Sequence, residues 1–237
     1  YQYTDEIIRN TTTGGTVYKD MNGKKYAENI SQLALANVDF DMQNRHHISY
    51  NLMMIHANTQ SVGDYNGKNS IFSDDYENLG FTRRQQTNDN MLIVNQLMSN
   101  WGLTKSLSLD AGASYNMVKG YEPDRRINNL TKAEDGYTLL RGNSQQRYFS
   151  TLDEDDLNVK AGLVYRLKDN IEEISNVRFG YTGRFVDDNF KATEYNLTVG
   201  HVYTIPSLDN FSLDDYYNQE NFASDWFKIQ KNLDEYT

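Results

Sequence analysis

Hydrophobic and polar positions alternate along the stretch from Leu107 to Met117. The apolar side chains fall at odd positions and the polar ones at even positions, as Ser108, Asp110, Gly112, Ser114 and Asn116. A period of two predicts a β-strand whose faces meet different surroundings. Those surroundings are either a dry protein core and water, or lipid and a wet interior.

The same alternation recurs in five more segments and predicts an all-β chain. The segments cover residues 34–42, 48–54, 87–101, 157–167 and 177–185. The third is the least regular, because Met91, Ile93, Leu97 and Trp101 share one face while other apolar residues lie opposite. We expect about six or seven antiparallel strands.

Connections of two lengths separate these segments. Those at 43–46, 102–105 and 168–175 are short, whereas those at about 63–82 and 119–153 are long and polar. Strict alternation of short and long connections predicts an up-and-down sheet with tight turns at one end and long loops at the other. A soluble sandwich and a transmembrane barrel both permit this order. The loop asymmetry and the charged inward positions favour the barrel.

Composition narrows the function classes. The 237 residues are 38% hydrophobic and 13% aromatic, and the net charge of -10 argues against nucleic-acid binding, which requires a basic surface. The absence of Cys excludes disulfides and thiolate metal sites. No apolar run approaches the ~20 residues of a transmembrane helix, whereas a barrel strand needs only ~9–11.

Three segments carry a resemblance to a known family. The chain has "SNWGLTKSLSLDAGASYNMVKGYEPDRR" from Ser99, which resembles a recurring barrel hairpin of TonB-dependent outer-membrane receptors. "NVRFGYTGRFVDDNFKATEYNL" resembles the long arginine-bearing strand of those barrels, and "SLDDYYNQENF" with "NLDEYT" resembles the extracellular loop that follows it. The resemblance touches most of residues 27–237.

The resemblance implies a 22-stranded barrel with long extracellular loops, closed by a plug domain. It also implies energised uptake of a scarce ligand across the outer membrane of a Gram-negative bacterium. The implied partners are outer-membrane lipid and TonB, reached through a plug domain outside this chain; a surface lipoprotein is left open. We find no TonB box, plug or terminal aromatic strand. We therefore expect one partial barrel domain, with strands and loops at 27–203 and an extracellular loop with a short helix at 204–237.

Two expectations concern the end of the chain. The apolar parity of residues 177–203 survives "VDDNF", which predicts one long strand projecting beyond the membrane, without a turn. The alternation is lost in 205–237, so we expect no barrel strand there. Trp226, Ile229 and Leu233 are spaced by three and four residues, which predicts a short amphipathic helix.

Aromatic side chains in the expected loops are candidates for ligand binding. Stacking and hydrogen bonding of a small polar ligand suit such residues, although loop packing uses them as well. The candidates are Tyr65, Phe72, Tyr76, Tyr137, Tyr148, Phe149, Tyr216 and Tyr217. The sequence does not identify the ligand.

Other motifs favour structural roles. In "GYEPDRR", Pro123 is expected to fix the chain as it leaves a strand, and the charges around it to form an ion-pair network. Asn-Gly pairs at 22–23 and 66–67 predict turns. "DEDD" at 153–156 favours a solvated run over a cation site. His46 and His47 should point to opposite faces and not share a metal.

No catalytic motif occurs, and we expect no enzyme, no cofactor and no metal. A soluble all-β binding module is the alternative to the transporter. A third possibility, an enzyme on a β scaffold, is supported by no sequence motif.

Overall fold

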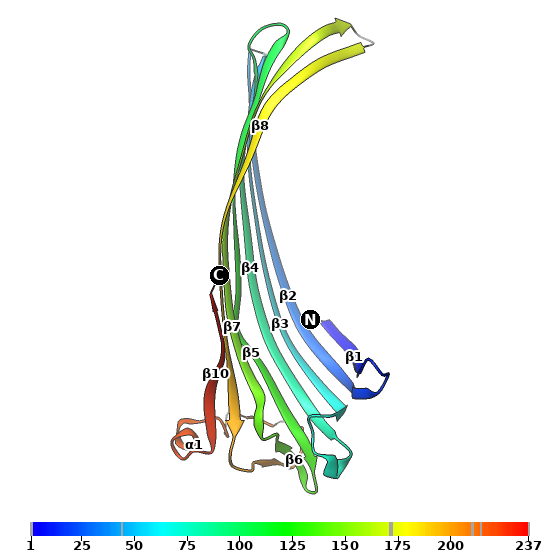
Figure 1. The fold of residues 1–237 in the computed structure, drawn as a ribbon. Coiled ribbons are helices and arrows are strands. Elements are labelled where there is room, and N and C mark those ends of the chain that lie inside the picture. The colour runs from blue at the N-terminus through cyan, green and yellow to red at the C-terminus, as the bar shows by residue number, and fades with distance from the viewer. Residues whose placement is uncertain (1, 44, 171–172, 210, 214, 237) are drawn as a thin grey trace.

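Long antiparallel strands make up most of the chain (Figure 1). The computed structural model describes residues 2–43, 45–170, 173–209, 211–213 and 215–236. The strands are β1 (Gln2–Thr11), β2 (Val17–Met42), β3 (His46–Asn69), β4 (Leu79–Gly102), β5 (Leu107–Ala133), β6 (Gly136–Leu139), β7 (Gly142–Asn170), β8 (Glu173–Val199), β9 (Thr204–Ile205) and β10 (Phe227–Tyr236). The expected all-β fold is therefore confirmed.

The strands form one sheet with up-and-down order. Its path is β1-β2-β3-β4-β5-β7-β8-β10, with β6 on β5 and β9 on β6, and the pairings are antiparallel. The sheet is not closed. Among the described residues, β1 covers only 17–27 of β2, and β10 covers only 191–199 of β8. Residues 28–42 and 173–190 are therefore free sheet edges in the part of the chain that is described.

The short connections lie at the upper end of the sheet in Figure 1. Residues 43–45 join β2 to β3 and residues 103–106 join β4 to β5, as the sequence predicts. The third short connection is expected at 168–175. There β7 continues to Asn170 and β8 begins at Glu173, and residues 171–172 lie outside the described residues.

The expectation of long loops at 63–82 and 119–153 is wrong. Strands occupy most of both ranges, and the irregular connections shrink to residues 70–78 and the hairpins around β6. Apolar residues are too few and too irregularly spaced there for alternation to mark the strands, but pairing still satisfies their backbone groups. The Asn-Gly pairs lie inside β2 and β3 for the same reason. Gly67 has φ +152, and a Cβ on it would clash with the backbone oxygen of Asp20.

The expectation of a single long strand through "VDDNF" is confirmed. β8 runs from Glu173 to Val199 and pairs with β7 without reversing direction.

The expectation that residues 205–237 form no strand is wrong, because β10 pairs with the end of β8. Residues 191–199 would otherwise expose unpaired backbone groups at the sheet edge, and pairing with β10 satisfies them. Three apolar residues at helical spacing were too few to outweigh that pairing.

Helix is confined to two short elements in the described part of the chain. They are the 3-10 turn η1 (Asp74–Tyr76) and α1 (Gln219–Ala223), so a short helix does occur in 204–237, but it precedes the segment predicted to form it. None of the described helices is long and apolar enough to span a membrane.

The register brings apolar residues from six strands together on one face, which we call the apolar face. Residues directly opposite each other in an antiparallel pair share a face. One row across β2, β3, β4, β5, β7 and β8 reads Val38, Tyr50, Leu97, Ala113, Val159 and Gly183. The next reads Phe40, Ile48, Ser99, Ala111, Ala161 and Tyr181. These rows and their neighbours, residues 34–42 of β2, 107–117 of β5 and 157–165 of β7 among them, form the apolar band.

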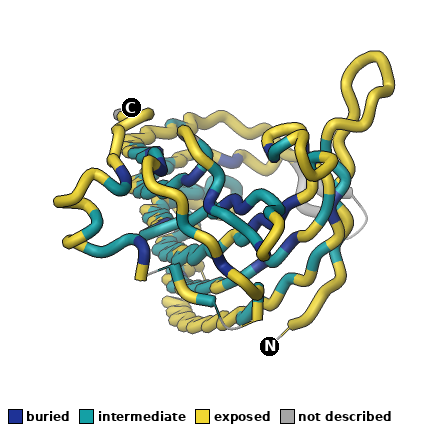
Figure 2. The backbone as a smooth tube through the Cα atoms, turned by 90° about the horizontal axis from the view of Figure 1, so that it is seen from below, coloured by how far each residue is buried: buried dark blue, intermediate teal, exposed yellow. Residues whose placement is uncertain are grey.

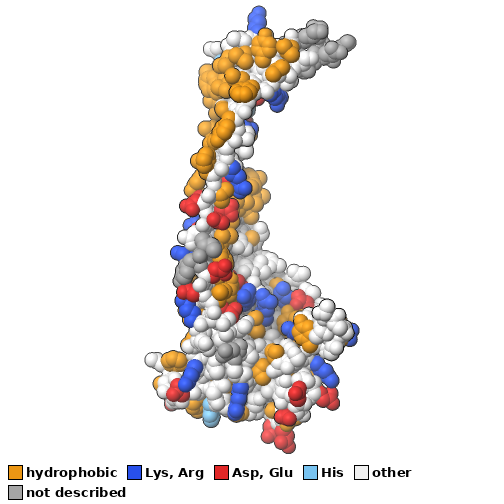
Figure 3. Space-filling model, in the orientation of Figure 1, with side chains coloured by type: hydrophobic (Ala, Val, Ile, Leu, Met, Phe, Trp, Pro, Cys, Tyr) orange, Lys and Arg blue, Asp and Glu red, His pale blue; other side chains and the backbone are white. Residues whose placement is uncertain are grey.

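The apolar band is exposed. Val38 is 64% exposed and Phe179 is 80% exposed. Hydrophobic side chains gather over the upper part of the sheet, whereas most charged side chains lie over its middle and lower parts (Figure 3).

Buried residues concentrate at the opposite end of the strands (Figure 2). The larger cluster lies on the apolar face and joins strands of the sheet to the segment 200–227. Its members are Phe81, Leu130, Leu139, Leu197, Val199, Ile205, Tyr216 and Phe227. The smaller cluster, Met21, Tyr65 and Phe72, lies on the other, polar face. Both faces are therefore packed at this end.

Leu130→Ala tests the larger cluster. Leu130 is 0% exposed and pairs with both Phe81 and Leu139, so the truncation should lower the free energy of unfolding by about 2–5 kcal/mol. Ile229→Ala is the control, because Ile229 is 53% exposed and should cost less than about 1 kcal/mol. Denaturant unfolding of the full-length protein measures both. Equal losses would contradict the assigned core.

Candidate functional site

The polar face carries a continuous row of hydrogen-bonding side chains behind the apolar band. Across the same six strands one row reads Asn37, Asn51, Gln96, Ser114, Asn158 and Arg184. Asn37 donates to Asn51 at 2.6 Å, and the Arg184 guanidinium lies 3.1 Å from the Asp156 carboxylate. This face suits contact with water or with a polar solute.

A β-bulge at Pro123 and Asp124 changes which side chains of β5 reach the apolar face. Glu122 pairs with Ser150 and Arg125 with Tyr148, so the two bulge residues stand opposite Phe149 alone. Odd positions of β5 lie on the apolar face before the bulge and even positions after it. Proline favours such a position because it cannot donate a ladder hydrogen bond. The expectation that the strand ends near Pro123 is therefore wrong.

The bulge builds an ion-pair cluster around Asp124. Its carboxylate accepts from Arg126 Nε at 2.5 Å and from Arg147 Nε and Nη2 at 3.0 and 2.5 Å. Arg126 and Arg147 stand directly opposite each other, where like charges repel. Asp124 offsets that repulsion, so the ion-pair network predicted from "GYEPDRR" is confirmed, with Arg147 joining from outside the motif.

Burial and hydrogen bonding act in opposite directions on the Asp124 carboxyl. Burial alone would raise its pKa, but the hydrogen bonds from Arg147 and Arg126 outweigh burial and hold the pKa below its usual value. Asp124 is therefore ionised at neutral pH.

A third arginine is fixed on the same face. Arg83 of β4 makes two hydrogen bonds of 2.7 Å to the Asp64 carboxylate, and its guanidinium lies 4.2 Å from the centre of the Phe211 ring. Phe211 belongs to the segment between β9 and α1, so a cation-π contact holds that segment over β4.

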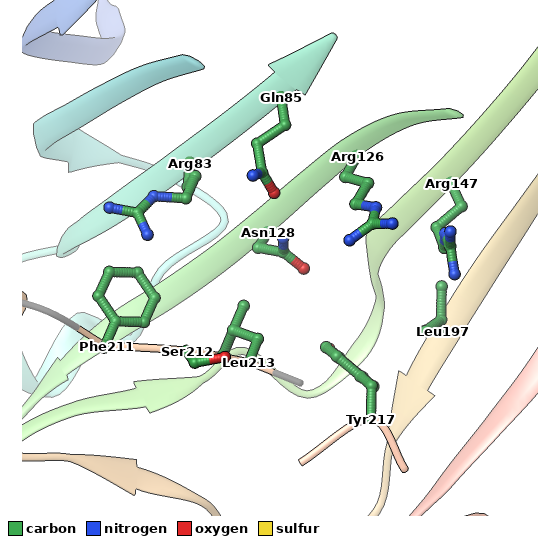
Figure 4. Close-up of a pocket in the computed structure, with 10 residues that line it drawn as sticks. All are labelled: Arg83, Gln85, Arg126, Asn128, Arg147, Leu197, Phe211, Ser212, Leu213 and Tyr217. Carbon is green, nitrogen blue, oxygen red and sulfur yellow. The ribbon is translucent and has the colours of Figure 1, made fainter. Parts of the chain in front are cut away.

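These three arginines line a pocket of about 250 Å³, which we call the arginine pocket (Figure 4). Its other walls include Gln85, Asn128, Leu197, Phe211, Leu213 and Tyr217. The Tyr217 hydroxyl is buried and has no hydrogen-bond partner among the described residues. Burial raises the pKa of Tyr217, so the hydroxyl keeps its proton and can donate it in a hydrogen bond.

The aromatic side chains predicted to contact a ligand do not gather in one place. Tyr65 and Phe72 are buried on the polar face, where the Tyr65 hydroxyl donates to Glu6 at 2.5 Å. Burial, helped by that carboxylate, raises the pKa of Tyr65 to about 12. Tyr76 lies in η1 and is 36% exposed.

Three of the other five belong to the larger cluster or pack against it. Tyr137, Tyr216 and Tyr217 pack there, and Tyr216 donates to the backbone oxygens of His201 and Trp226. Tyr148 and Phe149 are consecutive in β7 and point to opposite faces, with the Arg125 guanidinium 4.1 Å from the Tyr148 ring centre. Of the eight, only Tyr217 lines the arginine pocket.

Sequence reasoning missed the arginine pocket. Its signal was a set of arginines that flank the alternating runs of an acidic chain, Arg83 and Arg147 before a run and Arg126 after one. Within the described ranges, no group of three or more His, Asp or Glu side chains is arranged to hold a metal ion.

Comparison with known proteins adds no family to this picture. No protein-family model matches the chain, and no curated protein matches it.

Asp124→Asn tests the ion-pair cluster. The change leaves Arg126 and Arg147 opposed without a carboxylate, and should lower stability at pH 7 by about 1 kcal/mol, because solvent still reaches both guanidinium groups.

The effect of Asp124→Asn should depend on pH. The folded-state pKa of Asp124 is depressed, so its stabilising contribution is present above the ordinary value of about 4 and is lost as pH falls through the folded-state pKa. Thermal melting of wild type and variant should therefore differ at pH 7 and converge in acid. A difference that persists unchanged in acid would contradict the assigned ion pairs.

Proposed function

We propose that the chain forms part of the wall of a transmembrane β-barrel in a TonB-dependent transporter of a Gram-negative outer membrane. The apolar face meets lipid and the polar face lines the lumen. The free edges of β2 and β8 pair with further strands of the barrel. Transport of a small ligand then depends on a plug domain and on TonB, and a surface lipoprotein is a further candidate partner.

The exposed apolar band carries the proposal. Its alternating residues span 34–42 of β2, 107–117 of β5 and 157–165 of β7, close to the ~9–11 residues that a tilted strand needs to cross a bilayer. Among the described residues, no second layer of protein covers it. Charged and polar side chains follow beyond it on the same face, beginning with Asp155 and Asp187.

Free energy favours lipid over water at this surface. Burying one large apolar side chain gains about 1.5–3 kcal/mol, whereas a whole domain is stable by about 5–15 kcal/mol. The band includes Phe40, Tyr181 and Phe185, each more than half exposed. Transfer of several such side chains from water to lipid would therefore release free energy comparable to the stability of a whole domain.

The alternative, a soluble all-β binding module, requires a partner layer over the band. A soluble sandwich packs a second sheet about 10 Å from the first. Neither the short helices nor the segment between β8 and β10 supplies one in the described part of the chain, because that segment packs at the far end of the strands.

A smaller apolar patch lies on the polar face. It consists of Leu33, Leu35, Met53, Ile55, Leu92 and Val94, paired across β2, β3 and β4. Leu33 and Leu35 are 62% and 68% exposed. A plug domain inside the barrel, as the resemblance implies, would cover this patch and leave the remaining polar rows to line the lumen.

Site-specific quenching in bilayers tests the proposal. The chain has no Cys, so single cysteines at 109, 111 and 113 report one face of β5, and cysteines at 110, 114 and 116 report the other. A lipophilic quencher should reach fluorophores at the first set strongly and at the second set weakly, because lipid touches only the apolar face. Position 112 is avoided, since a Cβ there would lie 2.8 Å from Lys160 Cε.

If the chain were a soluble binding module, protein would cover positions 109, 111 and 113 and the quencher would not reach them. Uniform protection of positions 109, 111 and 113 in the full-length protein would overturn the membrane assignment. The matched control is Leu103→Cys, labelled in the same way, because Leu103 is exposed and lies in the turn between β4 and β5, outside the alternating segment.

A further inference from the structure

The arginine pocket is separate from the polar face that the proposed function assigns to transport. The odd positions of β4 and the even positions of β5 after the bulge reach the apolar face, which places Arg83, Gln85 and Arg126 there. Gln85 lies beyond Ile93 of the apolar band by about 26 Å of strand, at ~3.3 Å per residue. A ligand here would bind on the outer side of the wall, well beyond the band.

The pocket holds more positive than negative charge. Three guanidinium groups line it, and the carboxylates of Asp64 and Asp124 bind them. Asp124 accepts hydrogen bonds from Nε and Nη2 of Arg147 but only from Nε of Arg126. The terminal nitrogens of Arg126 and Nη1 of Arg147 therefore remain as donors beside each other, held in place by Asp124.

Neutral donors and apolar surface complete the pocket. The Tyr217 hydroxyl is buried without a hydrogen-bond partner among the described residues, a state that costs free energy unless a ligand accepts a hydrogen bond from it. Gln85 and Asn128 supply amide groups, while Phe211 and Leu213 form an apolar wall (Figure 4). The volume of about 250 Å³ lies below the ~300–1,000 Å³ of drug-sized ligands, so it fits a small molecule.

From these contacts we infer that the arginine pocket binds the phosphate group of a small polar phosphate ester. Two adjacent guanidinium groups present more N–H donors than the two oxygens of a carboxylate can satisfy, whereas a phosphate offers a third oxygen and a larger charge. The amides of Gln85 and Asn128 then meet the polar body of the ester. The same phosphate chemistry could come from a soluble ester or from the sugar of an outer-leaflet glycolipid.

Binding of glucose 6-phosphate to the full-length protein tests this inference. Titration calorimetry in detergent should show saturable binding of glucose 6-phosphate and none of glucose. In a second arm, vesicles that carry lipid A, a phosphorylated glycolipid, should compete with the ester if the lipid is the source. Competition by lipid A identifies the lipid source, and binding without competition identifies the soluble source; both support a phosphate site.

Two variants separate the pocket from general charge effects. Arg126→Gln should weaken binding of glucose 6-phosphate about tenfold or more, because it removes one charged donor of the pair. Lys119→Gln, which removes a charge from an exposed side chain on the same face of β5 that pairs with Asp153 at 3.6 Å, should leave affinity unchanged.

Tyr217→Phe tests whether a loss of binding could come from misfolding of a variant. It keeps the ring and removes a buried hydroxyl without a partner, so the fold should be at least as stable while affinity falls by about fivefold. Absence of saturable binding of either phosphate compound to the wild-type protein would overturn the inference. Equal losses in Arg126→Gln and Lys119→Gln would overturn it too. Neither result bears on the quenching pattern of the apolar band, so the barrel proposal stands or falls separately.

Discussion

Register between neighbouring strands is the constraint on which the rest of the structure depends. A shift of one residue between β2 and β3 would move Val38 and Phe40 away from Tyr50 and Ile48 and mix apolar with polar rows. The observed pairing instead keeps six strands in phase, so that one face is apolar over a membrane-crossing length and the other carries amides and charges around a smaller apolar patch. The exposed band, and with it the proposed contact with lipid, follows from this agreement in phase.

One extra residue in β5, at the bulge, contributes to both the buried cluster and the arginine pocket. The bulge at Pro123 and Asp124 reverses the parity of β5, so Arg126 and Leu130 reach the same face as Met117, the last residue of β5 in the apolar band. Leu130 supports the buried cluster, and Arg126 joins Arg147 in the pocket. A regular strand would have turned Arg126 to the polar face and left Arg147 without its neighbour. The same local irregularity therefore serves both packing and binding.

The segment between β8 and β10 completes the pocket rather than entering the polar face. Phe211 stacks on Arg83, Tyr216 fills the cluster, and Tyr217 closes one wall. Because β10 returns to pair with β8, both ends of the segment are anchored on the sheet. This anchoring explains how irregular backbone can hold a defined pocket: its ends are fixed by the ladder and its middle by aromatic contacts.

The sequence by itself determined the six long strands, their antiparallel order, the short turns and the continuity of β8, because side-chain alternation is a local property of any strand whose two faces meet different surroundings. It could not determine β1, β10 or the strand extensions around Gly67 and Asn128, where apolar residues are too few and too irregularly spaced to show alternation and only pairing with a distant strand reveals the strand. It named Tyr217 but not the arginines beside it. Only the tertiary structure decided that pocket, because Arg83, Arg126 and Arg147 come from three strands, and a bulge, which alternation does not record, sets which face they share.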